Sequence, residues 1–332
     1  MTRRWIAVAG LLAAACGGKT SPAPTPVANP PQIACPADVS VRGVGGITQP
    51  VDYAVPTVTG GAQPVNASCT QPSGSAFPLG TTTVNCTATD AASRQAACSF
   101  KVTLTGLTLG ATRFETVGDS LTEGENGAGQ RPSFVDPPNS YPTRLQALLD
   151  ESFPGQGITV INRGRGGDKI EKTVAELPGN LLRDRPEAVL VLTGYNDLEA
   201  CGPAQATSPA CGEATQRVAI GVRDCIRRAR ESPVGVKYIF VSTLTPPGTG
   251  PKRIDGGAVI ETNNKIRAFV SAERATLVDT YPSFIGREGA YVSSDGLHLQ
   301  PAGYQAIADG FFAAIKATIP QTSPAALSGA AR

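Results

Sequence analysis

The 332-residue chain has one histidine, His298, and an acidic residue, Asp295, precedes it by three positions in the stretch SSDGLHLQPAGY. Imidazole titrates near neutral pH and can take the proton of a serine hydroxyl, while a neighbouring carboxylate orients the ring and stabilises the imidazolium. A lone histidine is usually a surface or core residue without a chemical role. The catalytic interpretation therefore requires a nucleophile, oxyanion donors and a suitable fold elsewhere in the chain.

A candidate nucleophile, Ser120, lies in the stretch GDSLTEG, directly after the apolar run 113–119. Gly118 permits a tight turn, so Ser120 would stand at the carboxyl edge of a strand and near the start of a helix. Backbone N–H groups at such a place favour a developing negative charge. The alternative is that Ser120 only caps this helix and that Asp119 is a loop residue.

Further polar residues follow other apolar runs. The stretch NRGRGGD follows the second run and TGYND follows the third. Each brings a Gly and an Asn to the same edge of the predicted sheet. The stretch with the histidine follows the last run and a loop. Each short motif is weak evidence alone, but four of them in this order, each after the expected element, form a specific pattern.

The elements that must position these residues begin near residue 110, where apolar runs alternate with helical stretches. The apolar runs are 113–119, 158–162, 188–194, 236–243 and 276–280, and the helical stretches include 141–153, 215–231, 261–273 and 301–319. Strands that alternate with helices predict a parallel sheet covered on both faces. Ligands bind such sheets at the carboxyl ends of the strands, which is where the motifs fall.

A different pattern occupies residues 34–106, which we predict to be all-β. Apolar residues alternate along two stretches, with Val84, Cys86 and Ala88 on one face of the first and Cys98, Phe100, Val102 and Leu104 on one face of the second. Short strands separated by Gly and Pro turns predict a small sandwich.

The N-terminus predicts export. Arg3 and Arg4 precede the apolar run WIAVAGLLAAAC, which is too short for a stable membrane anchor. Residues 1–16 resemble a bacterial lipoprotein signal whose cleavage leaves Cys16 as the lipidated first residue, although Ala13 stands where that signal usually has Leu. Ordinary cleavage to a secreted protein is the alternative, and twin-arginine export is a further one. We expect transport across the bacterial inner membrane and then a lipid anchor in the cell envelope, or an extracellular protein.

Composition limits the other classes of function. A net charge of +2 with 17% charged residues gives no basic stripe for nucleic acid. Eight cysteines indicate an oxidising compartment. One histidine without a clustered ligand set predicts no zinc or other metal site, and we expect no cofactor. We expect a monomer, a Pro-rich linker over residues 17–33 and a disordered tail over residues 319–332.

Residues 110–318 resemble the SGNH hydrolases of the GDSL esterase/lipase family, whose motif blocks span nearly the whole segment. The resemblance implies a three-layer α/β/α domain, with Ser120 as the nucleophile and Asp295 and His298 as its partners in a catalytic triad. The residue after the histidine is Leu299, where many members have Pro.

The same resemblance implies an oxyanion hole. The family pattern Asn-x-x-x-x-Gly falls on Asn162 and Gly167, so that Gly167 would donate its backbone N–H. Asn196 would donate its side-chain amide, and Ser120 its own N–H. Tyr195, beside Asn196, is a departure that alters the wall of the pocket.

Residues 34–106 resemble a hyalin-repeat (HYR) domain, an immunoglobulin-like module. Its four cysteines allow three pairings. With this resemblance we expect disulfides between Cys35 and Cys98 and between Cys69 and Cys86. Such a module is either an adhesion or glycan-contacting unit or a spacer between the envelope and the next domain.

Two further cysteines, Cys201 and Cys211, bracket a short loop after Asn196, and a disulfide there would staple the rim of the site. Such a bond would shape the substrate site or only stabilise the loop. Cys225 shares a helix face with apolar residues, which predicts a buried free thiol.

These residues together predict a serine carboxylic-ester hydrolase that works through an acyl-Ser120 intermediate. The first substrate class is an acetylated extracellular or cell-wall polysaccharide, and short-chain lipids or small acyl esters are the rival. The alternative function is an adhesion or glycan-binding lipoprotein with a non-catalytic hydrolase-like domain. That alternative predicts decayed catalytic positions, whereas all five are present. Membrane contact is expected only through the lipid anchor.

Overall fold

The structure of this protein is a computed structural model that describes residues 28–43, 46–127 and 134–322. The expected signal segment 1–16, its Cys16 and most of the expected linker 17–33 lie outside the described residues. Within the described ranges, none of the helices combines the length and the hydrophobicity that a membrane span requires.

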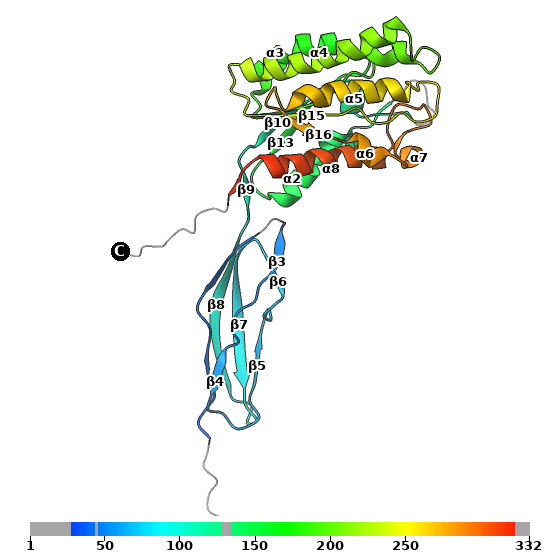
Figure 1. The fold of residues 1–332 in the computed structure, drawn as a ribbon. Helices are drawn as coiled ribbons and strands as arrows, with labels where there is room; N and C mark the ends of the chain where they lie inside the picture. Colours follow the sequence, from blue (N-terminus) through cyan, green and yellow to red (C-terminus); the bar gives the residue numbers. More distant parts are fainter. Residues whose placement is uncertain (1–27, 44–45, 128–133, 323–332) are drawn as a thin grey trace, which may run out of the picture. The chain divides into compact units, whose positions relative to one another are not determined.

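The described part of the N-terminal region is all-β, as predicted (Figure 1). The strands are β1 (Gln32–Ala34), β2 (Val39–Arg42), β3 (Thr48–Pro50), β4 (Thr57–Thr59), β5 (Asn66–Cys69), β6 (Ala76–Pro78), β7 (Gly80–Thr89) and β8 (Gln95–Thr105). Strands β2, β8, β7 and β5 form a sheet in this order, while β1 pairs with β4 and β3 pairs with β6. The alternation on β7 holds, because Val84, Cys86 and Ala88 are all fully buried.

Disulfides join Cys35 to Cys98 and Cys69 to Cys86, the pairs expected from the HYR resemblance. By backbone contacts the chain divides into two compact units. The first contains residues 54–72 and 84–100 together with the described residues before 37. The second contains 37–53, 73–83 and all described residues from 101 onward.

The remainder of the chain is an α/β domain built on a five-stranded parallel sheet. The sheet strands are β10 (Arg113–Gly118), β13 (Thr159–Gly164), β14 (Ala188–Leu192), β15 (Tyr238–Ser242) and β16 (Thr276–Val278), in the spatial order β13-β10-β14-β15-β16. All five coincide with the predicted apolar runs. Every residue of β14 is buried, as a central strand covered on both faces requires.

Helices form a layer on each side of this sheet. Helices α3 (Ile170–Asp184), α4 (Pro209–Glu231) and α5 (Gly256–Val270) cover one face, and α2 (Tyr141–Ser152) and α8 (Pro301–Thr318) cover the other (Figure 1). Shorter elements are α1 (Ser120–Glu123), α6 (Tyr281–Phe284), α7 (Glu288–Tyr291), the 3₁₀ helices η1 (Pro137–Asn139) and η2 (Asp197–Cys201), and the strand pair β11 (Glu125–Asn126) and β12 (Phe134–Val135). The expected three-layer α/β/α domain after a β-rich region is confirmed.

Two features differ from the prediction. Helix α3 was not predicted, because Pro178 and Gly179 interrupt its sequence, yet its buried face holds the helix together through Leu177 and Leu181. The tail from residue 319 is not wholly irregular. Strand β17 (Gln321–Thr322) pairs antiparallel with β9 (Thr108–Leu109), so the chain stays ordered for a few residues beyond α8. Residues 323–332 lie outside the described part.

Candidate active site

Ser120 is the first residue of α1 and is separated from the end of β10 by Asp119 alone, and its side chain is almost fully buried. A Cβ on Gly118 would overlap the carbonyl oxygen of Leu192 and the hydroxyl of Thr122, so the turn needs glycine at this position. The N-cap of α1 is Asp119, whose carboxylate accepts from Leu121 N. Ser120 is therefore not the capping residue, and its hydroxyl is directed elsewhere.

Asp119 links two of the sequence motifs. Its Oδ1 accepts a hydrogen bond from Leu121 N at 3.1 Å, and its Oδ2 accepts from Gly194 N at 3.0 Å and Tyr195 N at 3.1 Å. Burial raises the pKa of Asp119 to about 6, although these three donors favour its charged form. The carboxylate thus fixes the loop that carries Ser120 to the loop that carries Asn196. The alternative in which Asp119 is only a loop residue does not account for these contacts.

His298 connects Ser120 to Asp295. Its Nε2 lies 3.0 Å from Ser120 Oγ, and its Nδ1 lies 2.6 Å from Asp295 Oδ2. The other carboxylate oxygen, Oδ1, accepts from the backbone N–H groups of Leu297 and His298, both at 3.0 Å. Burial alone would raise the pKa of Asp295, but these hydrogen bonds outweigh it and lower the pKa to about 2. Asp295 is therefore an anion at neutral pH and favours a proton on Nδ1.

Three glycines accommodate this short turn. A Cβ on Gly127 would overlap the carboxyl group of Asp295, and one on Gly250 would overlap the backbone of Ser294 and Asp295. Gly296, inside the turn, has a φ of 86°. The Asp295 carboxyl group and its turn thus pack closely against glycines, and a larger residue at Gly127 or Gly250 would overlap them.

Two of the three predicted oxyanion donors, Gly167 and Asn196, lie on loops that follow β13 and β14. Gly167 has a φ of 80°, and the neighbouring Gly166 N donates to Glu123 Oε2 at 2.6 Å. Asn162 does not enter the site as a donor; its Oδ1 accepts from Gly164 N at 2.9 Å and so shapes this loop.

Asn196 Nδ2 donates to the carbonyl oxygen of Asp168 at 2.9 Å, which orients the amide and leaves it a second N–H. The next residue, Asp197, accepts from Ile170 N at 2.8 Å and thus ties the start of α3 to this loop.

A cavity of about 470 Å³ joins these groups. It is lined by Ser120, Gly167, Asn196 and His298, by the charged residues Glu125, Glu199, Lys252 and Arg253, and by Tyr195, Gly202, Pro203, Pro251, Ile254 and Leu297. Asp295 lies behind His298, away from the cavity lining. The structure therefore brings the five predicted residues together from positions 120 to 298, and their chemical roles stay predictions.

Tyr195 contacts the loop after β15 through its hydroxyl. Its hydroxyl lies 2.8 Å from Thr245 Oγ1 and is buried. It forms part of the cavity wall, as expected, and anchors the β14 loop to the loop after β15.

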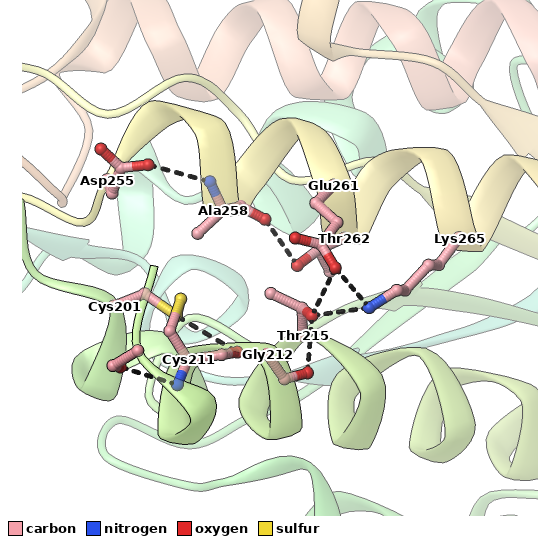
Figure 2. Close-up of a disulfide and its surroundings, with 10 residues drawn as sticks. Cys201, Cys211, Gly212, Thr215, Asp255, Ala258, Glu261, Thr262 and Lys265 are labelled. Carbon is pink, nitrogen blue, oxygen red and sulfur yellow. Dashed lines mark hydrogen bonds and ion pairs between the residues drawn. A yellow bond between two sulfur atoms is a disulfide. The ribbon is translucent and has the colours of Figure 1, made fainter. Parts of the chain in front are cut away.

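The predicted disulfide between Cys201 and Cys211 joins η2 to the first turn of α4 (Figure 2). The carbonyl oxygen of Cys201 accepts from Asp255 N at 2.7 Å, next to the cavity-lining segment 251–254. A hydrogen bond also joins α4 to α5: Lys265 Nζ of α5 donates to Thr215 Oγ1 of α4 at 2.7 Å (Figure 2). The disulfide thus fixes η2, whose Glu199 lines the cavity, to the start of α4. Cys225 is a buried free cysteine, and burial raises the pKa of its thiol to about 12, so it is not a nucleophile.

Sequence reasoning missed one more group at the site. Glu125 Oε2 lies 3.2 Å from His298 Nε2, the nitrogen that faces Ser120. Glu125 follows the GDSLTEG motif by a single position, but it lies in a stretch without periodicity, so no pattern singled it out. In the described part of the chain, no cluster of three or more His, Cys, Asp or Glu side chains is arranged to hold a metal ion.

Comparisons with known proteins agree with the two resemblances. The sequence model of the GDSL-like lipase/acylhydrolase family matches residues 116–306, and that of the HYR domain matches residues 28–104. Esterase TesA of Pseudomonas aeruginosa is 26% identical over 156 residues, which are 46% of this chain and 68% of that protein.

Solved structures with a similar fold cover 62% of this chain. They include LAE5, an α/β hydrolase enzyme from the metagenome of Lake Arreo in Spain, with 21% identity, a TM-score of 0.49 and 95% of its chain covered. The acetylxylan esterase Axe2 of Geobacillus stearothermophilus has 20% identity, a TM-score of 0.49 and 95% of its chain covered. A lipase/acylhydrolase of Enterococcus faecalis has 19% identity, a TM-score of 0.47 and 96% covered.

Proposed function

This chain belongs to the GDSL-like lipase/acylhydrolase family and is an ester hydrolase, and from this premise we propose that it cleaves carboxylic esters through a Ser120–His298–Asp295 triad. The observation that carries the proposal is the hydrogen-bonded series from Ser120 Oγ to His298 Nε2, and from Nδ1 to Asp295 Oδ2, with distances of 3.0 Å and 2.6 Å. Each contact has the length that proton transfer and ring orientation require.

In the acylation step, His298 Nε2 takes the proton of the Ser120 hydroxyl while Oγ forms a bond to the ester carbonyl carbon. The carbonyl oxygen becomes an oxyanion and accepts hydrogen bonds from Ser120 N, Gly167 N and Asn196 Nδ2. Each donor is worth about 10²–10³ in rate. When the tetrahedral intermediate collapses, the ester C–O bond breaks, and the leaving alkoxide takes the proton from Nε2 and departs as an alcohol.

The deacylation step repeats these transfers with water. Nε2 takes a proton from a water molecule as its oxygen bonds to the acyl carbon, and the same oxyanion donors stabilise the second intermediate. Its collapse breaks the bond to Ser120 Oγ, which recovers its proton from Nε2. The products are an alcohol and a carboxylic acid, and the enzyme returns to its initial state.

We propose esters with a short acyl group as substrates, with acetyl esters of an extracellular polysaccharide as the first class. A cavity of about 470 Å³ suits a small ligand, and Pro203, Ile254 and Leu297 provide an apolar wall for an acyl chain. Short-chain lipid or other small esters are the rival class.

The HYR match is compatible with an extracellular or envelope protein. We propose export through segment 1–16 and lipidation at Cys16, supported by the sequence alone.

The test is the turnover of p-nitrophenyl acetate by the purified protein and by Ser120→Ala. We expect loss of nearly all turnover in the variant, and equal rates in both would overturn the proposal. A series of p-nitrophenyl esters of increasing chain length, followed by acetylated xylan and acetylated peptidoglycan, then separates the two substrate classes.

A further inference from the structure

The Nε2 atom of His298 faces two oxygen atoms. Ser120 Oγ lies 3.0 Å from it and Glu125 Oε2 lies 3.2 Å from it. On the other edge of the ring, Nδ1 contacts Asp295 Oδ2. The imidazole is therefore held between two carboxylates, and only that of Asp295 has a role in the mechanism above.

The Glu125 carboxylate is confined on several sides. Its backbone belongs to β11, which pairs with β12, and its carbonyl oxygen accepts a hydrogen bond from the Tyr304 hydroxyl of α8. A Cβ on Gly166 would overlap Glu125 Oε1, so the carboxylate packs directly against that glycine. The side chain thus lies between the imidazole and the loop of Gly167, and it lines the cavity.

We propose, on the basis of the function above, that Glu125 is a second catalytic carboxylate, which stabilises the imidazolium formed when His298 takes a proton from Ser120 or from water. The proton on Nε2 lies beside Glu125 Oε2, so the positive charge develops next to a negative one. Glu125 neither gains nor loses a proton over the cycle. Asp295 stabilises the same cation from Nδ1.

Other charged and titratable groups surround Glu125 and His298 and contribute to the electrostatic potential at both residues. They are Asp119 before α1, Glu123 of α1, Lys252 and Arg253 of the loop before α5, Asp295 of the His298 turn and Tyr304 of α8. Lys252 Nζ lies 3.5 Å from Asp295 Oδ2. Burial raises the pKa of Glu125, whereas His298 acts in the opposite direction, so the carboxylate is most effective toward neutral and alkaline pH.

The proposal has a distinctive consequence for the pH profile. Where the resting imidazole is neutral, Glu125 stabilises only the transition state. Where an imidazolium is already present in the resting enzyme, the carboxylate brings no advantage. A charge at this distance moves a protonation equilibrium by about one pH unit. In Glu125→Gln the acid limb of kcat/KM therefore moves about one unit toward acid and the plateau falls about tenfold, so the two profiles converge at low pH.

The experiment measures kcat/KM for p-nitrophenyl acetate from about pH 4.5 to 9 in the wild type and Glu125→Gln. Gly166→Ala is a second variant, because its methyl group displaces the Glu125 carboxylate without a change in charge, and it should move the acid limb in the same direction. Glu199→Gln makes the same chemical change in the same cavity without a contact to the imidazole among the described interactions, and it should leave the acid limb in place.

A Glu125→Gln profile that equals the wild type, or that falls uniformly with the acid limb unmoved, would overturn the proposal. A shift as large in Glu199→Gln would do so too. If Glu125→Gln does not fold, the acid limb of Gly166→Ala decides. Ser120→Ala in the same assay separates the two proposals, since its loss of turnover leaves the esterase assignment standing whatever Glu125 does.

Discussion

The stability of the α/β domain should depend on pH through Glu115, in the middle of β10. Its side chain is fully buried, and neither carboxyl oxygen has a hydrogen-bond partner among the described residues. Burial raises the pKa of Glu115 to about 8, and the charge of Asp184 adds to this, while Arg163 opposes it. An ionised carboxylate without a partner is costly inside a protein.

The sign and size of the effect follow from that shift. Because the folded-state pKa lies above the usual value of 4.5, the stability contributed by this group is complete below about pH 4.5 and is lost as the pH rises toward 8. At pH 7 the loss is about 3 kcal/mol. Glu115→Gln keeps the shape and cannot ionise, so it should match the wild type near pH 4.5 and be more stable by about 3 kcal/mol at pH 7.

The assay is urea unfolding followed by helical circular dichroism, which reports on the α/β domain because the described helices lie there. Glu171→Gln, an exposed carboxylate on α3, is the control and should change the free energy of unfolding by less than about 0.5 kcal/mol at any pH. A difference between Glu115→Gln and the wild type that stays constant from acid to neutral pH would refute the reasoning.

Three further variants test the supports of the site. Asp119→Ala leaves three buried N–H groups without their acceptor, so we expect about 2 kcal/mol lower stability by urea unfolding and about 100-fold slower ester turnover. The double variant Cys201→Ser and Cys211→Ser opens a loop with a sequence separation of 10 and should lose about 2–3 kcal/mol, measured as a lower urea midpoint; an unchanged midpoint would contradict this. Gly127→Ala pushes a methyl group into the Asp295 carboxyl and should lower kcat about tenfold with KM nearly unchanged, by steady-state kinetics.

Much of the fold could be predicted because its signals are local and periodic. The five sheet strands are apolar runs, and four long helices show a 3.6-residue apolar spacing. Helix α3 buries residues at a similar spacing, namely Ile170, Thr173, Leu177 and Leu181, but Pro178 and Gly179 conceal this pattern. Tertiary packing overrides the low helix propensity of these two residues, and propensity alone cannot reveal that.

The residues of the site also differ in whether the sequence could predict them. Ser120, Asp295 and His298 carry motif signals, so their convergence could be expected. Glu125 and Asp119 act through contacts with residues far along the chain, such as the 3.2 Å approach of Glu125 to His298 and the bonds of Asp119 to the β14 loop. Such contacts depend on the folded arrangement and leave no periodic trace in the sequence.

The central claim is that the Ser120 hydroxyl is a nucleophile activated by His298. The most direct measurement is mass spectrometry of the intact protein and its peptides after treatment with a fluorophosphonate, which reacts covalently with activated serines. We predict one adduct, on the peptide that contains Ser120, with no adduct in Ser120→Ala and greatly slowed labelling in His298→Ala. Labelling of a different residue, or equal labelling of the Ser120→Ala variant, would contradict the account.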